Sequence, residues 1–421
     1  MSGRAAIRGI SPRLDVFDHA VASDPYPVYA RLRAAGALCR AGPATLAVTR
    51  HAETASLLRD HRLGHGLPDM RRPAVMVGGL GTADEVMGRV LTKARPNGEL
   101  AHLVSGQDPP GHTRLRHLLK KALGPALRAR IGEVVRAESA RLLEIVLQRN
   151  SADVVGDVAF PLQTRVVGEL LGVPASERDE IARQAAELGR TIILIPFTPP
   201  GGSNGEPEAR RLRDYVADLL RSRRAKPGDD LLSRLATTTI GDDRLSDDEI
   251  VDNAVFLFFA GFETSIHLLA GGVAALMRFP GQFARLRAEP GLAVTAVEEF
   301  LRYDAPLQWI SRTTNDVVQV GTARVRPGRF LLLLLASANR DERAFADPDL
   351  LDIGRHPNPH LSLGGGAHHC LGAALARTQG IAVFSLLARC CTDVEPAGPA
   401  RRRPHPNVRG YLELPVALRP A

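Results

Sequence analysis

Residues 359–377 contain the residue types and spacing that point most directly to chemistry. Cys370 follows a glycine-rich loop, and the Ala/Leu-rich run after it predicts a helix. A thiolate at a helix N-terminus is stabilised by the helix dipole and by backbone N–H groups that lack partners inside the helix. Gly364, Gly366 and Gly372 would let the backbone pass close to a flat, bulky group, because they carry no Cβ. A single thiolate in this setting suits the axial ligand of a haem iron.

Two other interpretations of this segment stay open on the residues alone. A buried free cysteine beside a glycine-rich turn is the more common use of a single cysteine. A zinc site is the second, because Cys370 lies near His360, His368 and His369 in sequence. Adjacent residues seldom bind one tetrahedral metal, however, and no second Cys/His pair stands at zinc-finger spacing. The zinc interpretation would make the chain a zinc-dependent nucleic-acid binder.

The segment resembles the haem-binding signature of the cytochrome P-450 superfamily, Phe-Gly-x-Gly-x-His-x-Cys-x-Gly. Its glycines, His368 and Cys370 match, and Leu363 stands where the signature has Phe. The resemblance implies that Cys370 is the axial ligand of haem b and that Leu363, Gly364, His368 and Gly372 line the cofactor. It also implies a mainly α-helical fold with small peripheral β-sheets, in which the haem lies between a long central helix and the helix after Cys370.

A second motif, Ala-Gly-Phe-Glu-Thr-Ser at residues 260–265, falls inside an apolar helical run. A carboxylate buried there is costly unless it is hydrated or paired. One interpretation is an acid on a solvated face, with Thr264 bonding back to a carbonyl one turn earlier. The motif also resembles the superfamily's oxygen-activating pattern. That resemblance implies that Thr264 hydrogen-bonds dioxygen, that Glu263 relays protons, and that Gly261 leaves room for oxygen while it and Ala260 contact the cofactor.

Basic residues in three places suit carboxylates. His112 and Arg116 are four residues apart, so they face the same way on a helix, and two donors on one face suit an anion. A basic surface helix is the plain alternative. The family resemblance implies that this pair, Arg312 and His368 contact the two haem propionates.

Glu299 and Arg302 stand three residues apart on an expected helix. Such a pair is usually a surface salt bridge that contributes little. Here it matches the family's Glu-x-x-Arg motif. The resemblance therefore implies a buried, structural pair on the cysteine side of the haem that ties to a downstream segment.

Composition limits the remaining classes. The 421 residues include 54 basic and 46 acidic side chains, a net charge of +8, but the arginines alternate with acids, which argues against nucleic-acid binding. Four cysteines without a disulfide pattern suit a reducing compartment. The N-terminus shows no secretory signal, and no apolar run reaches the roughly 20 residues of a membrane span. We therefore expect a cytoplasmic protein without a membrane partner. We expect one catalytic domain over residues 1–421, with residues 1–23 as a loosely ordered extension.

Most of the chain predicts helices, with few strands. The expected helices are residues 25–35, 52–60, 113–122, 126–149, 162–171, 177–195, 208–224 and 246–278. Ser246 and Glu249 predict a capping box that starts the longest of them. Strands are expected at 45–49, 317–320 and 330–335, with a hairpin around Pro406-Asn407. Residues 198–208 are linker-like and indicate either a domain boundary or a loop over a pocket.

The family's pocket-lining regions map onto residues 62–107, 192–208, 256–264, 307–310 and 407–410. Our candidate substrate contacts in these regions are Phe259, Leu307, Trp309 and Ile310, although a core position is an equally good interpretation of Trp309. The apolar side chains of these regions predict a hydrophobic substrate.

On this resemblance we expect a haem-thiolate monooxygenase that activates O2 and hydroxylates or epoxidises a hydrophobic small molecule, a bacterial secondary metabolite. Electrons would come from NAD(P)H through a ferredoxin and a ferredoxin reductase, because the chain has no flavin or iron–sulfur region. Arg114, Lys120 and Lys121 would form a basic face for the acidic electron donor. A monomer is the family's default.

Alternatives remain open. The same fold carries out oxidative coupling, desaturation, rearrangement or peroxide-driven oxidation. A non-catalytic haem protein that senses gas or carries electrons is the alternative from another class.

Overall fold

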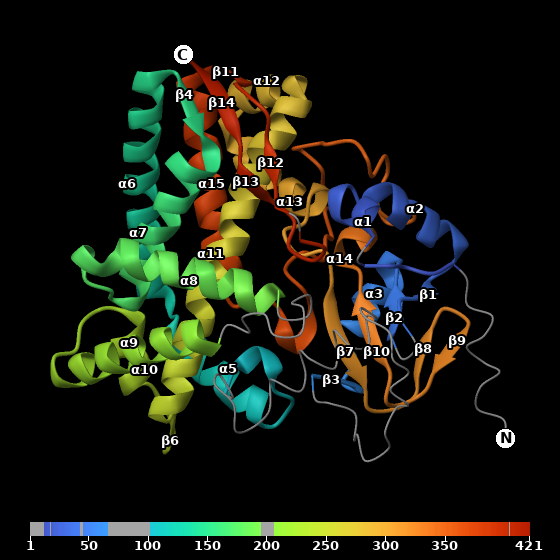
Figure 1. The fold of residues 1–421 in the computed structure, drawn as a ribbon, viewed down its shortest axis with the longest axis horizontal. Helices are drawn as coiled ribbons and strands as arrows, with labels where there is room; N and C mark the ends of the chain where they lie inside the picture. Colours follow the sequence, from blue (N-terminus) through green and yellow to red (C-terminus); the bar gives the residue numbers. More distant parts are fainter. Residues whose placement is uncertain (1–11, 17, 43–44, 66–101, 195–205, 404) are drawn as a thin grey trace.

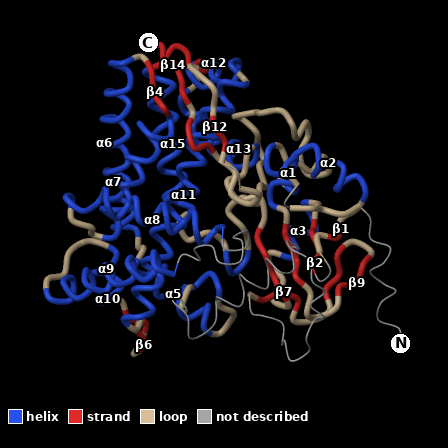
Figure 2. Tube along the Cα trace, in the orientation of Figure 1, coloured by secondary structure: helices blue, strands red, loops and turns tan. Residues whose placement is uncertain are grey.

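The computed structural model describes residues 12–16, 18–42, 45–65, 102–194, 206–403 and 405–421. A large helical part lies beside a smaller part that holds a mixed sheet and the N-terminal helices (Figure 1). Coloured by secondary structure, the same view shows helices filling one side of the molecule and most strands gathering on the other (Figure 2). The mainly α-helical fold with small sheets is therefore confirmed.

Most of the helices before residue 240 begin and end close to where the sequence predicts them. They are α1 (His19–Ser23), α2 (Tyr26–Ala35), α3 (His51–Leu57), α5 (Gly111–Ala122), α6 (Pro125–Arg149), α7 (Phe160–Leu171), α8 (Arg178–Leu194), α9 (Glu206–Ala225) and α10 (Leu231–Thr237). The prediction for 52–60 is too long, because the chain turns after Leu57. The sequence analysis missed α1 and α10. The N-cap of α10 was a usable signal, because the side chain of Asp230 accepts a hydrogen bond from the Ser233 N–H.

The long helix α11 (Asp247–Arg278) runs through the centre of the helical part (Figure 1). Its capping box is confirmed: the Glu249 N–H donates to Ser246 Oγ at 3.2 Å, and the Ser246 N–H donates to Glu249 Oε2 at 2.9 Å. Most of its side chains are buried, and it packs against α7, α8 and α9. This helix therefore carries residues 260–265 into the interior.

One described helix, α11, is long and apolar enough to cross a membrane by those two criteria alone. Of its most apolar window, 72% is buried inside the protein. The buried core helix of a soluble protein meets the same criteria, so α11 is weak evidence for a membrane span.

The five-stranded sheet joins strands from distant parts of the chain. Its order is β1 (Leu38–Arg40), β2 (Thr45–Val48), β10 (Phe330–Leu333), β7 (Ile310–Thr314) and β3 (Leu63–Gly64). β10 runs parallel to β2 and antiparallel to β7. The strand predicted at 330–335 is confirmed but shorter, because helix α14 (Leu335–Ala338) follows it.

The remaining strands form small sheets. β11 (Cys391–Pro396), β14 (Pro415–Pro420) and β4 (Ser151–Asp153) make a three-stranded sheet, and three pairs are β5 (Thr239–Ile240) with β6 (Asp243–Arg244), β8 (Val318–Val320) with β9 (Ala323–Val325), and β12 (Arg401–Arg402) with β13 (Tyr411–Glu413). The last pair confirms the hairpin predicted around Pro406-Asn407.

Three further helices follow α11: α12 (Pro280–Ala288), α13 (Ala293–Tyr303) and α15 (Ala373–Cys390). α15 packs against α6 and α13 as well as α11. The helix predicted after Cys370 is thus confirmed, and its packing fixes the position of the loop before it.

The N-terminal segment packs against the rest of the protein where it is described. Leu14, Val16 and Val21 are buried in a hydrophobic cluster with Tyr29 of α2 and Trp309. These apolar side chains anchor the described residues 14–16 and 18–23.

Candidate active site

The loop before α15 has a tightly fixed backbone. The Cys370 N–H donates to the Leu363 carbonyl at 2.9 Å, which closes the loop on itself. Gly364 and Gly366 have φ of 70° and 61°, which favours glycine at both positions. A Cβ at Gly366 would also lie 2.5 Å from the carbonyl oxygen of Leu58, so only glycine fits there.

Cys370 lies three residues before the start of α15, with its side chain exposed. The protein atoms crowded around the sulfur nevertheless raise the pKa of its thiol by desolvation. The backbone N–H groups of Gly372 and Ala373 and the guanidinium groups of Arg116 and Arg377 oppose this rise by stabilising the thiolate. The loop therefore presents an accessible sulfur to which helix N–H groups and two cations are directed.

The middle of α11 carries the acid and the alcohol. Thr264 Oγ1 donates to the Ala260 carbonyl at 2.8 Å, the back-bonded arrangement that the sequence left as one interpretation. A Cβ added at Gly261 would meet nothing within 4 Å, so open space adjoins the helix at this turn. This space agrees with the room expected beside Gly261.

Glu263 is buried rather than placed on a solvated face. Its Oε2 lies 2.9 Å from a guanidinium nitrogen of Arg403, which follows β12, and 3.3 Å from Nε2 of His267, one turn along α11. The sequence analysis missed Arg403 and His267. His267 stands at i+4 from Glu263 and could have been found from this spacing, but nothing local marks Arg403 as its partner.

Four separate segments bring histidine and arginine side chains together. The rings of His112 and His368 stack with centroids 3.8 Å apart, and the His65 ring lies 4.0 Å from that of His368. Arg312, on β7, is buried beside them and donates to the Ser311 carbonyl at 2.7 Å. Both ring nitrogens of His112 are buried and make no hydrogen bond with a described residue.

Burial and mutual repulsion in this cluster disfavour the protonated forms of its histidines and of Arg312. Desolvation, together with the charges of His65, His112 and Arg312, lowers the pKa of His368 to about 2. Burial likewise lowers the pKa of Arg312 to about 10 and the pKa of His112 below its usual range. An anion bound here would satisfy the orphaned nitrogens and offset the crowded charge.

His65 was not predicted from the sequence. Its backbone N–H and Nδ1 contact the Asp108 carboxylate at 3.0 and 3.2 Å, which orients the ring towards His368. Arg116 donates to the His369 carbonyl and so links α5 to the cysteine loop. The expected donors, His112, Arg312 and His368, are therefore brought together, and Arg116 reaches the adjacent loop.

The zinc interpretation does not match the described geometry. Within the described part of the chain, three candidate metal ligands converge only at His65, Asp108 and His368. His360 instead lies 3.0 Å from a carboxylate oxygen of Glu298. The four residues proposed for zinc therefore do not form one site.

Glu299 and Arg302 form the buried pair that the family motif implied. Neither side chain is exposed, and Arg302 donates twice to the Glu299 carboxylate, at 2.8 Å each. Arg302 also donates to three downstream carbonyls, those of Asn339, Pro348 and Leu350. The pair thus ties α13 to the segment that leads towards the cysteine loop.

The candidate substrate contacts fall in different surroundings. Phe259 is buried in the main core around α11, whereas Trp309 is buried in the N-terminal cluster, as the core interpretation had it. Leu307 forms a β-bridge with Val408, and Ile310 starts β7. Of the proposed pocket regions, residues 66–101 and 195–205 lie outside the described residues.

The basic face proposed on α5 keeps its two lysines but loses Arg114. Arg114 pairs with Asp243 at 2.9 Å and with Glu249 at 2.6 Å, which neutralises its charge. Lys121 donates to the Thr239 carbonyl at 2.6 Å, and Lys120 is exposed. The two lysines, rather than all three residues, remain as the positive surface.

The residues present fit a haem. A loop of glycines leads to an accessible cysteine, and a crowded set of cationic donors lies beside the same loop with buried, unsatisfied nitrogens. Haem combines an iron that accepts a thiolate with two carboxylates that accept these donors.

Comparisons with known proteins agree with this geometry. The family model described as Cytochrome P450 matches residues 207–408. The Cytochrome P450 monooxygenase PikC of Streptomyces venezuelae is 34% identical over 94% of this chain and 92% of its own length. The Polyketide biosynthesis cytochrome P450 PksS of Bacillus subtilis (strain 168) is 32% identical over 74% of this chain and 76% of its own length.

Solved structures show the same likeness. P450BioI, in complex with hexadec-9Z-enoic acid ligated Acyl Carrier Protein, superposes with a TM-score of 0.81 at 31% identity. The match covers 95% of this chain and 99% of that chain. The likeness therefore extends over nearly the whole of both folds.

Proposed function

This chain belongs to the cytochrome P450 family and is a monooxygenase, and from that premise we propose that it hydroxylates or epoxidises a hydrophobic small molecule. Its electrons come from NAD(P)H through a ferredoxin and a ferredoxin reductase. The exposed lysines of α5, Lys120 and Lys121, suit contact with an acidic electron donor.

One observation carries the proposal: the cysteine loop also supplies a histidine to a buried cationic cluster. His368 stacks on His112 and lies in the field of Arg312, two residues before the only exposed thiol among the described cysteines. Cys370 would hold the haem iron, and His112, Arg312 and His368 would hold its carboxylates, with Arg116 and His65 beside them. When bound, haem supplies the redox chemistry that activates dioxygen, and a thiolate ligand favours O–O cleavage.

The other residues in the proposal handle protons and substrate. The Thr264 hydroxyl donates to the Ala260 carbonyl in this structure, and it would release that carbonyl to donate a hydrogen bond to dioxygen. Glu263, on the preceding position, relays protons to it. The apolar surroundings of Phe259 bind and orient the substrate and exclude water.

The substrate is proposed to be a bacterial secondary metabolite. The support is that the relative PksS is a polyketide biosynthesis cytochrome P450, together with the apolar character of the candidate pocket regions. Cytoplasmic location and a monomeric state complete the proposal.

The proposal is tested by the absorbance difference spectrum of the dithionite-reduced protein with and without carbon monoxide. We expect the strongly red-shifted Soret band of a thiolate-ligated haem, which Cys370→Ala should abolish. Cys390→Ala is the matched control, since Cys390 is a half-buried cysteine at the other end of α15. Addition of hydrophobic metabolites should then shift the spin state and raise NAD(P)H oxidation.

Each other outcome contradicts a stated part of the proposal. A protein without a haem band would overturn it altogether. A haem band without the red shift would mean that another residue, or a protonated Cys370, is the ligand. NAD(P)H oxidation that no substrate changes would favour a non-catalytic haem protein.

A further inference from the structure

A buried charged cluster joins α11 to the C-terminal strands, and the family motif includes only one of its members. Glu263, His267 and Arg403 have exposed side-chain fractions of 7%, 2% and 8%. The Glu263 carboxylate is 2.9 Å from Arg403 and 3.3 Å from Nε2 of His267. Two positive or potentially positive groups thus converge on the acid of the expected proton relay.

The C-terminal loop is shaped to hold the imidazole. A Cβ at Gly410 would lie 1.9 Å from Nδ1 of His267, so the ring packs directly against the backbone at that position. The backbone N–H of Arg403 donates to the Gly410 carbonyl at 3.0 Å. This hydrogen bond closes the loop that carries both Arg403 and Gly410. The same loop therefore supplies the guanidinium of Arg403 and the backbone surface against which the His267 ring packs.

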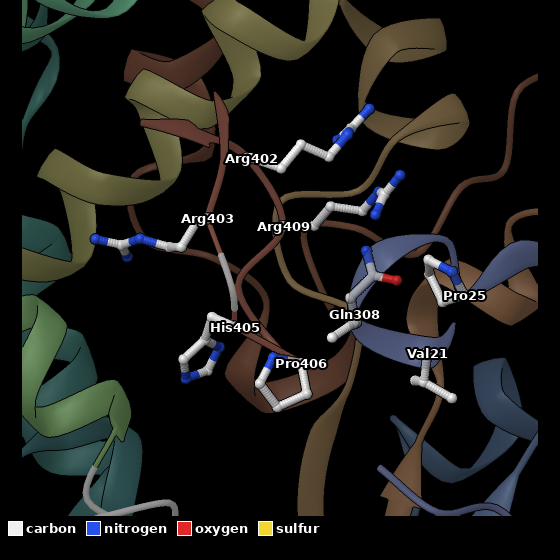
Figure 3. Close-up of a pocket in the computed structure, with 10 residues that line it drawn as sticks. Val21, Pro25, Gln308, Arg402, Arg403, His405, Pro406 and Arg409 are labelled. Atoms are coloured by element: carbon white, nitrogen blue, oxygen red, sulfur yellow. The ribbon is translucent and has the colours of Figure 1, made fainter. Parts of the chain in front are cut away.

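The other charged groups of this loop are directed elsewhere. Arg402 and Arg409 point away from Arg403 (Figure 3), and both pair with Asp304, at 3.6 and 2.7 Å. His405 accepts the Asn407 and Val408 N–H groups at Nδ1, so that nitrogen carries no proton. Arg401, on β12, pairs with Glu413 of β13 at the surface.

The chemistry of the three side chains assigns them different tasks. A guanidinium stays charged throughout the physiological range, so Arg403 holds Glu263 as a carboxylate. A carboxylate so held lacks the proton that a relay must deliver. Imidazole is the side chain whose charge ordinarily changes between pH 5 and 8, and the Nδ1 atom of His267 makes no hydrogen bond with a described residue.

We propose that His267 and Arg403 are positioning residues of this monooxygenase that act through Glu263, with His267 carrying the exchangeable proton of the cluster. The N–H bond of the imidazolium breaks and an O–H bond forms on the Glu263 carboxylate, which leaves the imidazole neutral. That O–H bond breaks in turn when Glu263 passes the proton towards Thr264, and Glu263 becomes a carboxylate again. Solvent then restores the proton to the ring. This inference rests on the proposed function, because it assigns the proton source of that reaction.

The first test compares the wild type with His267→Gln in the haem-loaded protein. Glutamine keeps an N–H donor near the position of Nε2 but does not titrate. We expect coupling, the product formed per NAD(P)H, to fall in the wild type as pH rises between 5 and 8. In the variant it should be independent of pH and roughly tenfold lower at low pH, a smaller loss than the hundredfold or more from losing the general acid itself.

A readout independent of activity follows the imidazole directly. Histidine ring carbon signals in an NMR titration should show one resonance, absent from His267→Gln, whose midpoint matches that of the coupling profile. His61→Gln is the control, because His61 is exposed and lies outside the site. A His267→Gln variant that keeps the wild-type pH profile, or a His267 resonance that does not move between pH 5 and 8, would overturn the inference.

The role of Arg403 is tested by its charge. Arg403→Gln should let Glu263 take up a proton at neutral pH, which appears in the infrared spectrum as a carboxylic-acid carbonyl band that Glu263→Gln removes. Arg403→Lys should keep the carboxylate and show no such band. If Arg403→Gln also shows no band, the guanidinium does not hold the charge of Glu263.

Failure of this inference differs from failure of the proposed function. A protein without the red-shifted carbon monoxide spectrum disproves the function itself. A protein with that spectrum and with substrate oxidation, in which His267→Gln changes neither profile nor coupling, disproves only the role of His267.

Discussion

Two buried carboxylate–guanidinium pairs, Glu299–Arg302 and Glu263–Arg403, do different work. Glu299 and Arg302 share two hydrogen bonds, Asp352 N–H and Asn358 also donate to the carboxylate, and the guanidinium binds backbone carbonyls. Glu263 and Arg403 share one 2.9 Å contact, beside a histidine whose ring nitrogens make no hydrogen bond with a described residue.

The difference shows that a buried charge pair can serve either to fix the backbone or to hold a proton-transferring group. A charge pair with every donor and acceptor engaged fixes the backbone, because no member can change protonation without breaking several bonds. A pair whose neighbour is a titratable ring leaves a route for one proton. The first arrangement is structural, and the second is suited to the relay that we propose.

The largest expected effect breaks the structural pair. Glu299→Gln leaves the Arg302 charge buried without a carboxylate, which should lower the free energy of unfolding by about 3–5 kcal/mol. Denaturant unfolding and the yield of haem-loaded protein measure this. Glu413→Gln is the control, because its pair with Arg401 is exposed and should contribute less than about 1 kcal/mol. Equal losses in the two variants would contradict the contrast.

A double replacement separates stability from chemistry at the other pair. Either single replacement leaves one buried charge without its partner and should destabilise the protein. The double variant Glu263→Leu with Arg403→Met removes both charges at similar volume, so its free energy of unfolding should lie within about 1–2 kcal/mol of the wild type. Coupled turnover should still fall by roughly 10²–10⁴, the usual contribution of a general acid. Unfolding and product assays measure the two effects.

The same double replacement at Glu299 and Arg302 serves as the comparison. It should not restore stability, because three backbone carbonyls lose their donor. Recovery at Glu299–Arg302, or restored coupling at Glu263–Arg403, would reverse the assignment of the two pairs.

The cationic cluster around His368 is a third buried charged group, and its effect on stability should depend on pH. Desolvation and the neighbouring charges lower the pKa of His368 to about 2 in the folded chain, whereas an unfolded histidine titrates near pH 6.5. The unfolded state therefore binds more protons between these values, and stability falls as pH falls below about 6.5. In the haem-free protein stability should fall between pH 6.5 and 5, and His368→Gln should remove part of that loss, because the pKa values of His65, His112 and His369 are lowered as well.

Haem binding provides the check on that result. Propionates held by the cluster should make the loss of stability on acidification smaller in the haem-loaded protein, as seen in thermal unfolding at several pH values. The same slope in haem-free wild type and His368→Gln would show that His368 does not carry the effect.

The smallest expected effect tests the packing of the His267 ring against Gly410. Gly410→Ala places a Cβ against His267 and should cost about 1–3 kcal/mol of unfolding free energy. Adding His267→Ala should remove part of that cost, because the two changes share one contact. Gly291→Ala is the control, since a Cβ there meets nothing within 4 Å. Strictly additive costs for Gly410→Ala and His267→Ala would disprove the packing.

The sequence predicted features that depend on neighbours along the chain. The capping box of Ser246 and Glu249 and the Glu299–Arg302 pair each lie within one helical turn, so spacing alone indicates them. The cysteine loop is likewise local, since the Cys370 N–H bonds to the Leu363 carbonyl.

What the sequence missed depends on distant segments. Arg403 meets Glu263, and His65 meets His368, only after the chain has folded, and neither has a local signal. The end of β10 was also missed, because an apolar run does not distinguish a buried strand from the short helix that begins at Leu335.

The parallel pairing of β2 with β10 has a consequence for the newly synthesised chain. Residues 45–48 leave the ribosome long before residues 330–333, and no turn can bring these two strands together early. Until β10 arrives, β2 has an unpaired edge that can pair with other chains. Aggregation of nascent chains should therefore be greatest for ribosome-stalled products that end before Phe330 and should decrease once Leu333 has emerged.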